Sequence, residues 1–317
     1  MNERRIIYIL EPFPFPSGGV AAIYRHVEIL TENGLAACVA LREKPKIDFY
    51  QTTAPLLIHG GHLQVREGDI FVIPEGFVEY MKALTPTRAK RLMFCQNQYY
   101  LRFTADARAG ISELGVHGVI ASSIAVQSFF HDVYGIADLP LLPYAIDPRR
   151  FAAADDKRRQ IAFMPRKLPD DGVFIAATFK RRHPRYADVP WVKIDGATQV
   201  EASRIMGESA VFLSLSHKES FGLPPLEALA CGCLVAGYHG DGGREYMTAE
   251  NGWWAETGDW KACVDGLAAA LELFDKGGPE LDTRRRAGAR TVEHYSPDRL
   301  KAALLTFWRR ELSAPFP

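Results

Sequence analysis

The sequence predicts an α/β protein made of two Rossmann-like domains. Short apolar runs typical of buried strands alternate with stretches at helical spacing along most of the 317 residues, a length that suits two domains. The alternation stops after Asp147, where residues 148–159 are charged, rich in alanine and without a strand pattern. We therefore expect one domain over 1–150, a second over 151–297, and a last helix over 298–317.

The first half opens with a βαβ pattern, which indicates a parallel sheet with helices on its faces. A strand over 6–10 is followed by a proline-rich loop with Gly18 and Gly19 at its end, a helix over 20–32 and a strand over 38–41. The remaining elements expected in this half are strands over 69–73, 92–95, 118–121 and 141–144, and helices over 105–114 and 123–134.

The second half repeats the same alternation of strands and helices. Its expected strands lie over 161–164, 191–194, 211–213 and 234–237, and its expected helices over 170–182, 199–208, 260–274, 281–294 and 298–312. In parallel sheets of this kind, ligands bind at the carboxyl ends of the strands. We therefore expect functional residues in the loops that follow the strands.

A strand, loop and helix around residues 211–232 form the stretch with the strongest functional signal. Pro224 and Pro225 suit the first turn of a helix, and Gly232 suits its end. The start of such a helix favours an anion. Glu219 and Glu227 flank this position with seven residues between them. Because carboxylates repel phosphate, we expect them to accept hydrogen bonds from hydroxyls, such as those of a sugar and a ribose on either side of a pyrophosphate.

This stretch resembles the donor-binding motif E-x7-E of retaining GT-B glycosyltransferases of family 4 (glycosyl transferases group 1), and Tyr144-Ala145-Ile146-Asp147 stands where the family has its linker signature N-G-V-D. The resemblance implies the GT-B fold: two Rossmann-like domains that face a central cleft, with a C-terminal helix that crosses back to the first domain. It further implies a retaining transfer of a sugar from a nucleotide diphosphate-sugar to a hydroxyl acceptor. The catalytic residues that we expect are Glu219, Arg166 and Lys167. The donor-binding residues that we expect are Glu227, Ser220, Phe221, Gly222, Leu223, Gly18, Gly19 and Glu245.

The residue types fit these roles. Arg166 and Lys167 follow the first strand of the second domain, where a guanidinium and an ammonium can hold a diphosphate. Gly18 and Gly19 allow a close approach of the backbone to a ligand. Glu245 lies in a glycine-rich turn that the family also has near the donor.

A histidine that the family often carries near the reacting centre is missing here. The corresponding stretch has Gln96 and Asn97, which can hydrogen-bond hydroxyls but cannot act as a base. His59, His62 and His217 remain candidates for that role.

Composition and motifs restrict the other possibilities. No D-x-D sequence occurs, so we expect a metal-independent enzyme without a cofactor, and the net charge of zero gives no general attraction to nucleic acid. Five scattered cysteines, the N-terminal sequence and the lack of a long apolar run lead us to expect a soluble, cytoplasmic protein without a transmembrane segment. A basic surface for peripheral membrane contact could involve Arg88, Lys90 and Arg91.

Two other functions stay open at this point. One is a nucleotide-sugar epimerase of the same architecture, which would need an acid and a base that Gln96 and Asn97 do not supply. The other is a protein that binds a nucleotide sugar without catalysis, a function that the missing histidine favours. The donor nucleotide, the sugar and the acceptor cannot be inferred from the sequence.

Overall fold

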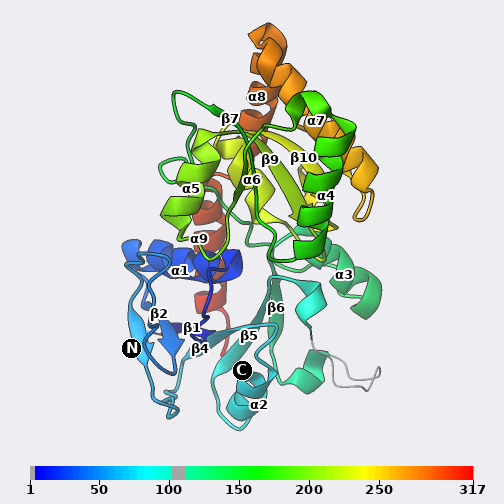
Figure 1. Ribbon diagram of the computed structural model, residues 1–317. Helices are drawn as coiled ribbons and strands as arrows, with labels where there is room; N and C mark the ends of the chain where they lie inside the picture. The colour runs from blue at the N-terminus through cyan, green and yellow to red at the C-terminus, as the bar shows by residue number, and fades with distance from the viewer. Residues whose placement is uncertain (1–3, 102–110, 317) are drawn as a thin grey trace. The chain divides into compact units, whose positions relative to one another are not determined.

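The computed structural model describes residues 4–101 and 111–316, and the chain divides into two compact units. Unit 1 comprises Met1–Tyr144 and Asp298–Pro317, and unit 2 comprises Ala145–Pro297 (Figure 1). Each unit contains a parallel sheet with helices on both faces, as the alternation of strands and helices predicts.

Unit 1 has a six-stranded sheet in the order β3-β2-β1-β4-β5-β6. Every pair of neighbours is parallel. The strands are β1 (Ile6–Leu10), β2 (Ala37–Leu41), β3 (Leu56–Ile58), β4 (Ile70–Pro74), β5 (Lys90–Cys95) and β6 (Gly118–Ala121). The order changes direction at β1 and β4, so the chain leaves the sheet on opposite sides there, as at a ligand-binding switch point.

Helices cover both faces of this sheet. On one face, α2 (Val78–Leu84) and α3 (Ile124–Tyr134) pack on a core that includes Ile7 and Ile9. On the other face lie α1 (Gly18–Glu32) and α9 (Pro297–Ser313), whose Trp308 ring meets that of Tyr8 with 6.4 Å between centroids.

The last helix, α9, is held to unit 1 by burial and by polar contacts. Trp308 is fully buried, Lys90 Nζ lies 2.6 Å from a carboxylate oxygen of Glu311, and Arg4 donates to the carbonyl oxygen of Leu312 at 2.8 Å. Arg91 is also buried and donates to backbone carbonyls. Two of the three cations considered for a basic membrane surface, Lys90 and Arg91, are thus engaged within the unit.

Unit 2 has a five-stranded parallel sheet in the order β11-β10-β9-β7-β8. The strands are β7 (Arg158–Phe163), β8 (Trp191–Lys193), β9 (Ser209–Ser216), β10 (Leu234–His239) and β11 (Gly252–Ala255). Helices α4 (Pro169–Arg182) and α7 (Trp260–Lys276) share one face, and α5 (Gln199–Glu208), α6 (Leu223–Ala230) and α8 (Gly278–Glu293) share the other (Figure 1). The central strand β9 is buried along its whole length, so the loop that follows it starts from a fixed position in the core.

Some local expectations differ from the structure. The strand expected over 141–144 is reduced to a single bridge between Ala121 and Leu141, because Pro140 and Pro143 cannot donate to a ladder. Of the helix expected over 105–114, only the 3-10 turn Ile111–Leu114 is described, and the rest lies outside the described residues.

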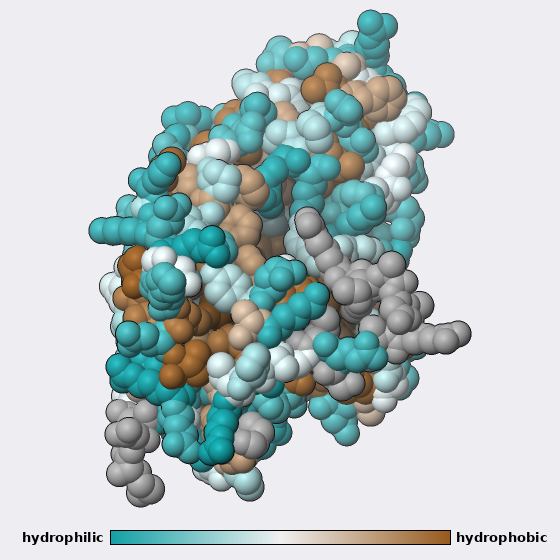
Figure 2. Space-filling view, turned by 90° about the horizontal axis from the view of Figure 1, so that it is seen from below, coloured by the Kyte–Doolittle hydropathy of each residue, from teal (hydrophilic) through white to brown (hydrophobic). Residues whose placement is uncertain are grey.

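None of the described helices is long and apolar enough to cross a membrane. The face drawn in Figure 2 mixes hydrophilic and hydrophobic residues, and the hydrophobic ones form separate patches.

Candidate active site

The residues expected to bind the donor gather at the carboxyl ends of β7, β9 and β10 in unit 2. Lys167 follows β7, Glu219 follows β9 and leads into α6, and Glu245 lies in the turn after β10. This is the edge of a parallel sheet at which ligands bind.

The loop between β9 and α6 has an unusual backbone. Lys218 has φ of 47° and Gly222 has φ of 84°, a left-handed conformation that glycine adopts without strain and lysine does not. Helix α6 begins directly after Gly222, with Pro224 and Pro225 in its first turn. Because proline has no N–H, the backbone donors at this helix start are those of Gly222 and Leu223, fewer than an ordinary helix offers.

An ion pair connects two of the expected catalytic residues. Lys167 Nζ lies 2.7 Å from a carboxylate oxygen of Glu219, and both side chains are about three-quarters buried, with 20% and 24% exposed. Lys167 Nζ also lies 3.5 Å from the carbonyl oxygens of His217 and Lys218. The loop thus wraps around the ammonium. Arg166, the neighbour of Lys167, is exposed on the same loop after β7.

Glu227 is a different kind of carboxylate. It lies on α6 and is only partly accessible to solvent, and burial raises its pKa to about 7. No side chain or backbone group among the described residues forms a hydrogen bond or an ion pair with its carboxylate. A half-buried carboxylate without such contacts is destabilising by itself, and it is well suited to accept hydrogen bonds from a ligand's hydroxyls.

Tyr246 lies close enough to these carboxylates for their charges to affect its pKa. Its hydroxyl donates to the carbonyl oxygen of Gly222, and the charges of Glu219, Glu227 and Glu245 contribute, after burial, to raising its pKa. Its ring also contacts Phe221, with 5.1 Å between the ring centroids. The start of α6 is therefore fixed from the side of β10.

The glycine-rich turn after β10 packs directly on the loop between β9 and α6. This loop, residues 217–222, is called the donor loop below because it carries the residues expected to bind the donor. The backbone N–H of Gly242 donates to the carbonyl oxygen of Glu219 at 2.8 Å. A Cβ atom on Gly242 would lie only 1.9 Å from the carbonyl carbon of Ser220, so no larger residue fits there. Ser220 and Phe221 are both buried, and Glu245 accepts a hydrogen bond from the Tyr295 hydroxyl at 3.2 Å. Ser220 and Phe221 thus shape the loop from inside.

Gly18 and Gly19 belong to unit 1 and meet a different set of residues. They form the first turn of α1, and the carbonyl oxygen of Gly19 accepts a hydrogen bond from the Gln96 side chain at 3.0 Å. A Cβ atom on Gly19 would lie 3.0 Å from Gln96 Oε1. The close approach at Gly19 is thus to Gln96, which follows β5.

A buried carboxylate that sequence analysis missed lies beside Gln96. Glu75 directly follows β4 and is 4% exposed, and its two oxygens accept the backbone N–H groups of Gln96 and Asn97, each at 3.0 Å. Burial raises its pKa to about 7. An acidic residue immediately after a buried parallel strand was the available signal.

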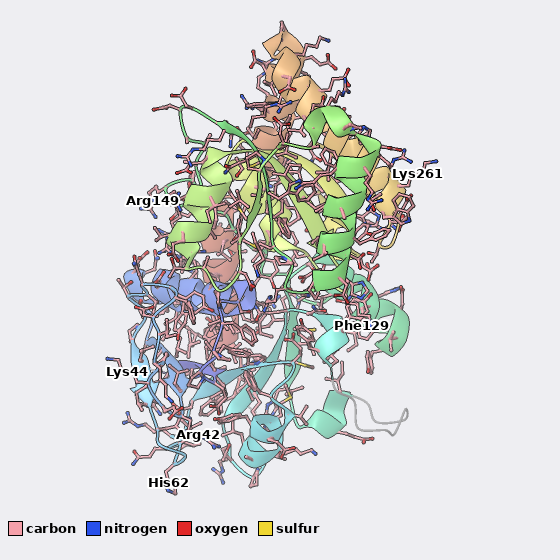
Figure 3. The ribbon with its side chains drawn as sticks, viewed as in Figure 1. Arg42, Lys44, His62, Phe129, Arg149 and Lys261 are labelled. Atoms are coloured by element: carbon pink, nitrogen blue, oxygen red, sulfur yellow. The ribbon has the colours of Figure 1, made fainter. Side chains whose placement is uncertain are left out.

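The three candidate histidines have different surroundings. His59 packs edge-on against the Tyr80 ring, burial lowers its pKa, and its Nε2 atom is buried without a hydrogen-bond partner among the described residues. His62 is exposed at the periphery of unit 1 (Figure 3). His217 lies in the donor loop and offers its carbonyl oxygen to Lys167.

The residues expected to act on the donor are thus brought together within unit 2, apart from the two glycines of unit 1. Among residues 4–101 and 111–316, no group of three or more histidine, cysteine, aspartate or glutamate side chains is arranged to hold a metal ion.

Comparisons with known proteins agree with this architecture. Residues 194–291 match the family described as Glycosyl transferases group 1. An alpha-1,6-glucosyltransferase of Actinobacillus pleuropneumoniae serotype 7 (strain AP76) is 26% identical over 287 residues, which are 87% of this chain and 86% of the relative.

Solved structures with similar folds include a sucrose-phosphate synthase and a protein in complex with UDP-glucose. Sucrose-phosphate synthase from Thermosynechococcus elongatus superimposes with a TM-score of 0.76 at 13% identity, over 99% of this chain and 100% of that one. HepE of Anabaena in complex with UDP-glucose superimposes with a TM-score of 0.73 at 14% identity, over 96% of this chain and 99% of that one.

The GT-B fold expected from the sequence is confirmed by these likenesses. The matched segment 194–291 contains the donor loop, α6 and Glu245. The two parallel sheets and the structural likenesses show the GT-B fold, and the match over residues 194–291, together with the glucosyltransferase relative, identifies the chain as a glycosyltransferase.

Proposed function

We propose that the protein is a retaining, metal-independent glycosyltransferase that moves glucose from UDP-glucose to a hydroxyl of a carbohydrate. The observation that carries the proposal is Glu227, a half-buried carboxylate with a pKa of about 7 and no partner among the described groups, next to the ion pair of Lys167 and Glu219. Hydroxyls of a bound ligand would donate hydrogen bonds to the Glu227 carboxylate. A diphosphate would compete with Glu219 for the Lys167 ammonium.

The roles of the individual residues follow from their chemistry. Glu227 accepts hydrogen bonds from the ribose hydroxyls, and Glu219 accepts them from the donor sugar, in keeping with the E-x7-E pattern of family 4. Lys167 and Arg166 hold the diphosphate and stabilise the charge that develops on the leaving UDP. Without donor, the pair of Lys167 and Glu219 keeps both charges neutralised in a partly buried place.

UDP-glucose is supported as the donor by similar proteins. The HepE structure contains UDP-glucose, and the curated relative is named a glucosyltransferase. The name alpha-1,6-glucosyltransferase also supports a carbohydrate acceptor and retention of the anomeric configuration. Metal independence is supported by the sequence, which has no D-x-D.

A binding and turnover experiment tests the proposal. Isothermal titration with UDP-glucose, UDP, GDP-mannose and ADP-glucose should give the tightest binding for the uridine ligands, and EDTA should not weaken it. Incubation with UDP-glucose and glucose-ended oligosaccharides should yield an α-linked product by NMR. Epimerised donor without acceptor would identify an epimerase, and tight binding without turnover would identify a binding protein. Either result, or no binding at all, refutes the proposed function.

A further inference from the structure

A hydrogen-bonded network lies at the carboxyl edge of the unit 1 sheet, in a different unit from the donor residues of unit 2. Glu75, Gln96 and Ser122 each directly follow a strand, namely β4, β5 and β6, which are neighbours in the sheet. The Glu75 carboxylate accepts the N–H groups of Gln96 and Asn97 at 3.0 Å, and the Ser122 hydroxyl donates to the carbonyl oxygen of Gln96 at 3.4 Å.

The network connects Glu75 to two segments, the glycine turn at the start of α1 and the 3-10 turn that carries Tyr99 and Tyr100. Through its side chain, Gln96 donates to the carbonyl oxygen of Gly19 at 3.0 Å and so holds the glycine turn at the start of α1. Through its side chain, Asn97 accepts the N–H of Tyr99 at 3.1 Å and so caps a short 3-10 turn. That turn presents Tyr99 with 45% and Tyr100 with 51% of their surface exposed.

We propose that Glu75 is a positioning residue for glycosyl transfer, and that it holds the turn at Gln96 and Asn97, and with it Gly19 and the two exposed tyrosines, in the arrangement that receives the carbohydrate acceptor. Exposed aromatic rings suit a sugar ring, which has apolar C–H faces. This inference rests on the proposed function for the identity of the acceptor.

The Glu75 carboxylate holds this turn at a cost to the stability of the folded state. The charge of Glu75 contributes, after burial, to raising the pKa of Cys95, and no cation among the described residues contributes to the pKa of Glu75. Burial without a cation raises its pKa to about 7, so the ionised form is costly to the folded state. A neutral side chain could fill the space with less cost, whereas only a carboxylate offers two acceptor oxygens to two adjacent N–H groups.

Glu28 provides a matched control in the same unit. It is also buried, at 6% exposed, and it also holds a loop: its Oε1 accepts the Thr52 hydroxyl at 2.7 Å and the Thr53 N–H at 3.0 Å. Thr52 and Thr53 precede β3 and are not part of the network around Gln96. Glu28 differs from Glu75 in that its Oε2 also lies 3.4 Å from Arg25 Nη1, so changes at Glu28 report the effect of losing a buried carboxylate together with its ion pair.

The test compares Glu75→Ala, Glu75→Gln and Glu28→Ala in the full chain, with UDP-glucose as donor and isomaltotriose as acceptor. We expect Glu75→Ala to lower kcat/KM for isomaltotriose at least tenfold, Glu75→Gln to lower it less, and neither to change the Kd for UDP-glucose more than twofold. Glu28→Ala should leave both quantities unchanged. Wild-type kcat/KM in Glu75→Ala, or an equal loss in Glu28→Ala, overturns the proposal.

Hydrogen exchange separates this inference from the proposed function. The amides of Gln96 and Asn97 should exchange faster in Glu75→Ala than in the wild type, and unchanged exchange overturns the proposal whatever the acceptor is. A wild-type protein that does not bind UDP-glucose would instead refute the proposed function, and the exchange result would still decide whether Glu75 holds the turn.

Discussion

Replacement of Glu227 by glutamine should make the protein more stable and a poorer binder of the donor. A pKa of about 7 instead of 4.5 means that ionisation of Glu227 costs the folded state about 3 kcal/mol more than the unfolded state. Glutamine removes this cost and keeps the shape of the side chain. Because Glu227 keeps some access to solvent, we expect a gain in unfolding free energy of about 2 kcal/mol at pH 8.

The sign of the pH dependence follows from the raised pKa. The wild-type carboxyl is neutral in both states below its unfolded pKa, and the penalty grows as the pH rises through the folded value of about 7. The stability gain of Glu227→Gln should therefore be full at pH 8 and nearly absent at pH 4.5. Glu219→Gln is the control, because Glu219 is paired with Lys167 and its loss should not stabilise the protein.

Donor affinity should change in the opposite direction. Hydrogen bonds to a charged acceptor contribute about 1 to 2 kcal/mol more than bonds to a neutral one, so Glu227→Gln should weaken UDP-glucose binding roughly 5- to 30-fold. Wild-type affinity should increase from pH 6 to pH 8 as the carboxyl ionises, and the variant should lose this dependence. Calorimetry and thermal unfolding measure both effects. A variant that binds UDP-glucose like the wild type, or that is less stable at pH 8, would refute the reasoning.

Two further predictions concern the donor loop. Gly242→Ala places a Cβ atom 1.9 Å from the Ser220 backbone, so the loop must move, and we expect a loss of about 2 kcal/mol in stability and at least tenfold in donor affinity. Gly76→Ala, where nothing lies within 4 Å of the added atom, is the matched control and should change neither quantity in thermal unfolding and calorimetry. Lys167→Met leaves Glu219 without the ammonium at 2.7 Å and removes a group that would hold the diphosphate. UDP affinity measured by calorimetry should therefore fall about tenfold or more. Unchanged UDP affinity would exclude Lys167 from the diphosphate site.

The sequence predicts most of the fold because most strands of both sheets contain a short apolar run. Apart from the helix expected over 105–114, which lies mostly outside the described residues, every long expected helix is present within a few residues of its expected bounds. The strand β3 was missed because Leu56–Ile58 has only three residues at the sheet edge and is largely exposed. The helix α2 was missed because Val78–Leu84 is too short for a clear helical period.

The sequence predicted those residues of the candidate site that belong to local motifs, above all one continuous strand–loop–helix motif. Glu219 and Glu227 stand in a single strand–loop–helix unit, so their spacing along the chain indicates their spacing in the fold. Glu75 contacts Gln96, which is 21 residues away, and Tyr246 contacts Gly222, which is 24 residues away. Contacts of this kind depend on the order of strands in the sheet, which the sequence alone did not provide.

The return of α9 to unit 1 has a consequence for how the chain folds during synthesis. The pocket around Tyr8 is filled by Trp308, and the whole of unit 2 is translated between these two residues. Unit 2 is contiguous and can fold as soon as it leaves the ribosome, whereas unit 1 begins first and is completed last. Until α9 has been synthesised, the core of unit 1 lacks Trp308 and leaves apolar surface uncovered. We therefore expect chaperone binding or aggregation to be most favoured in this period.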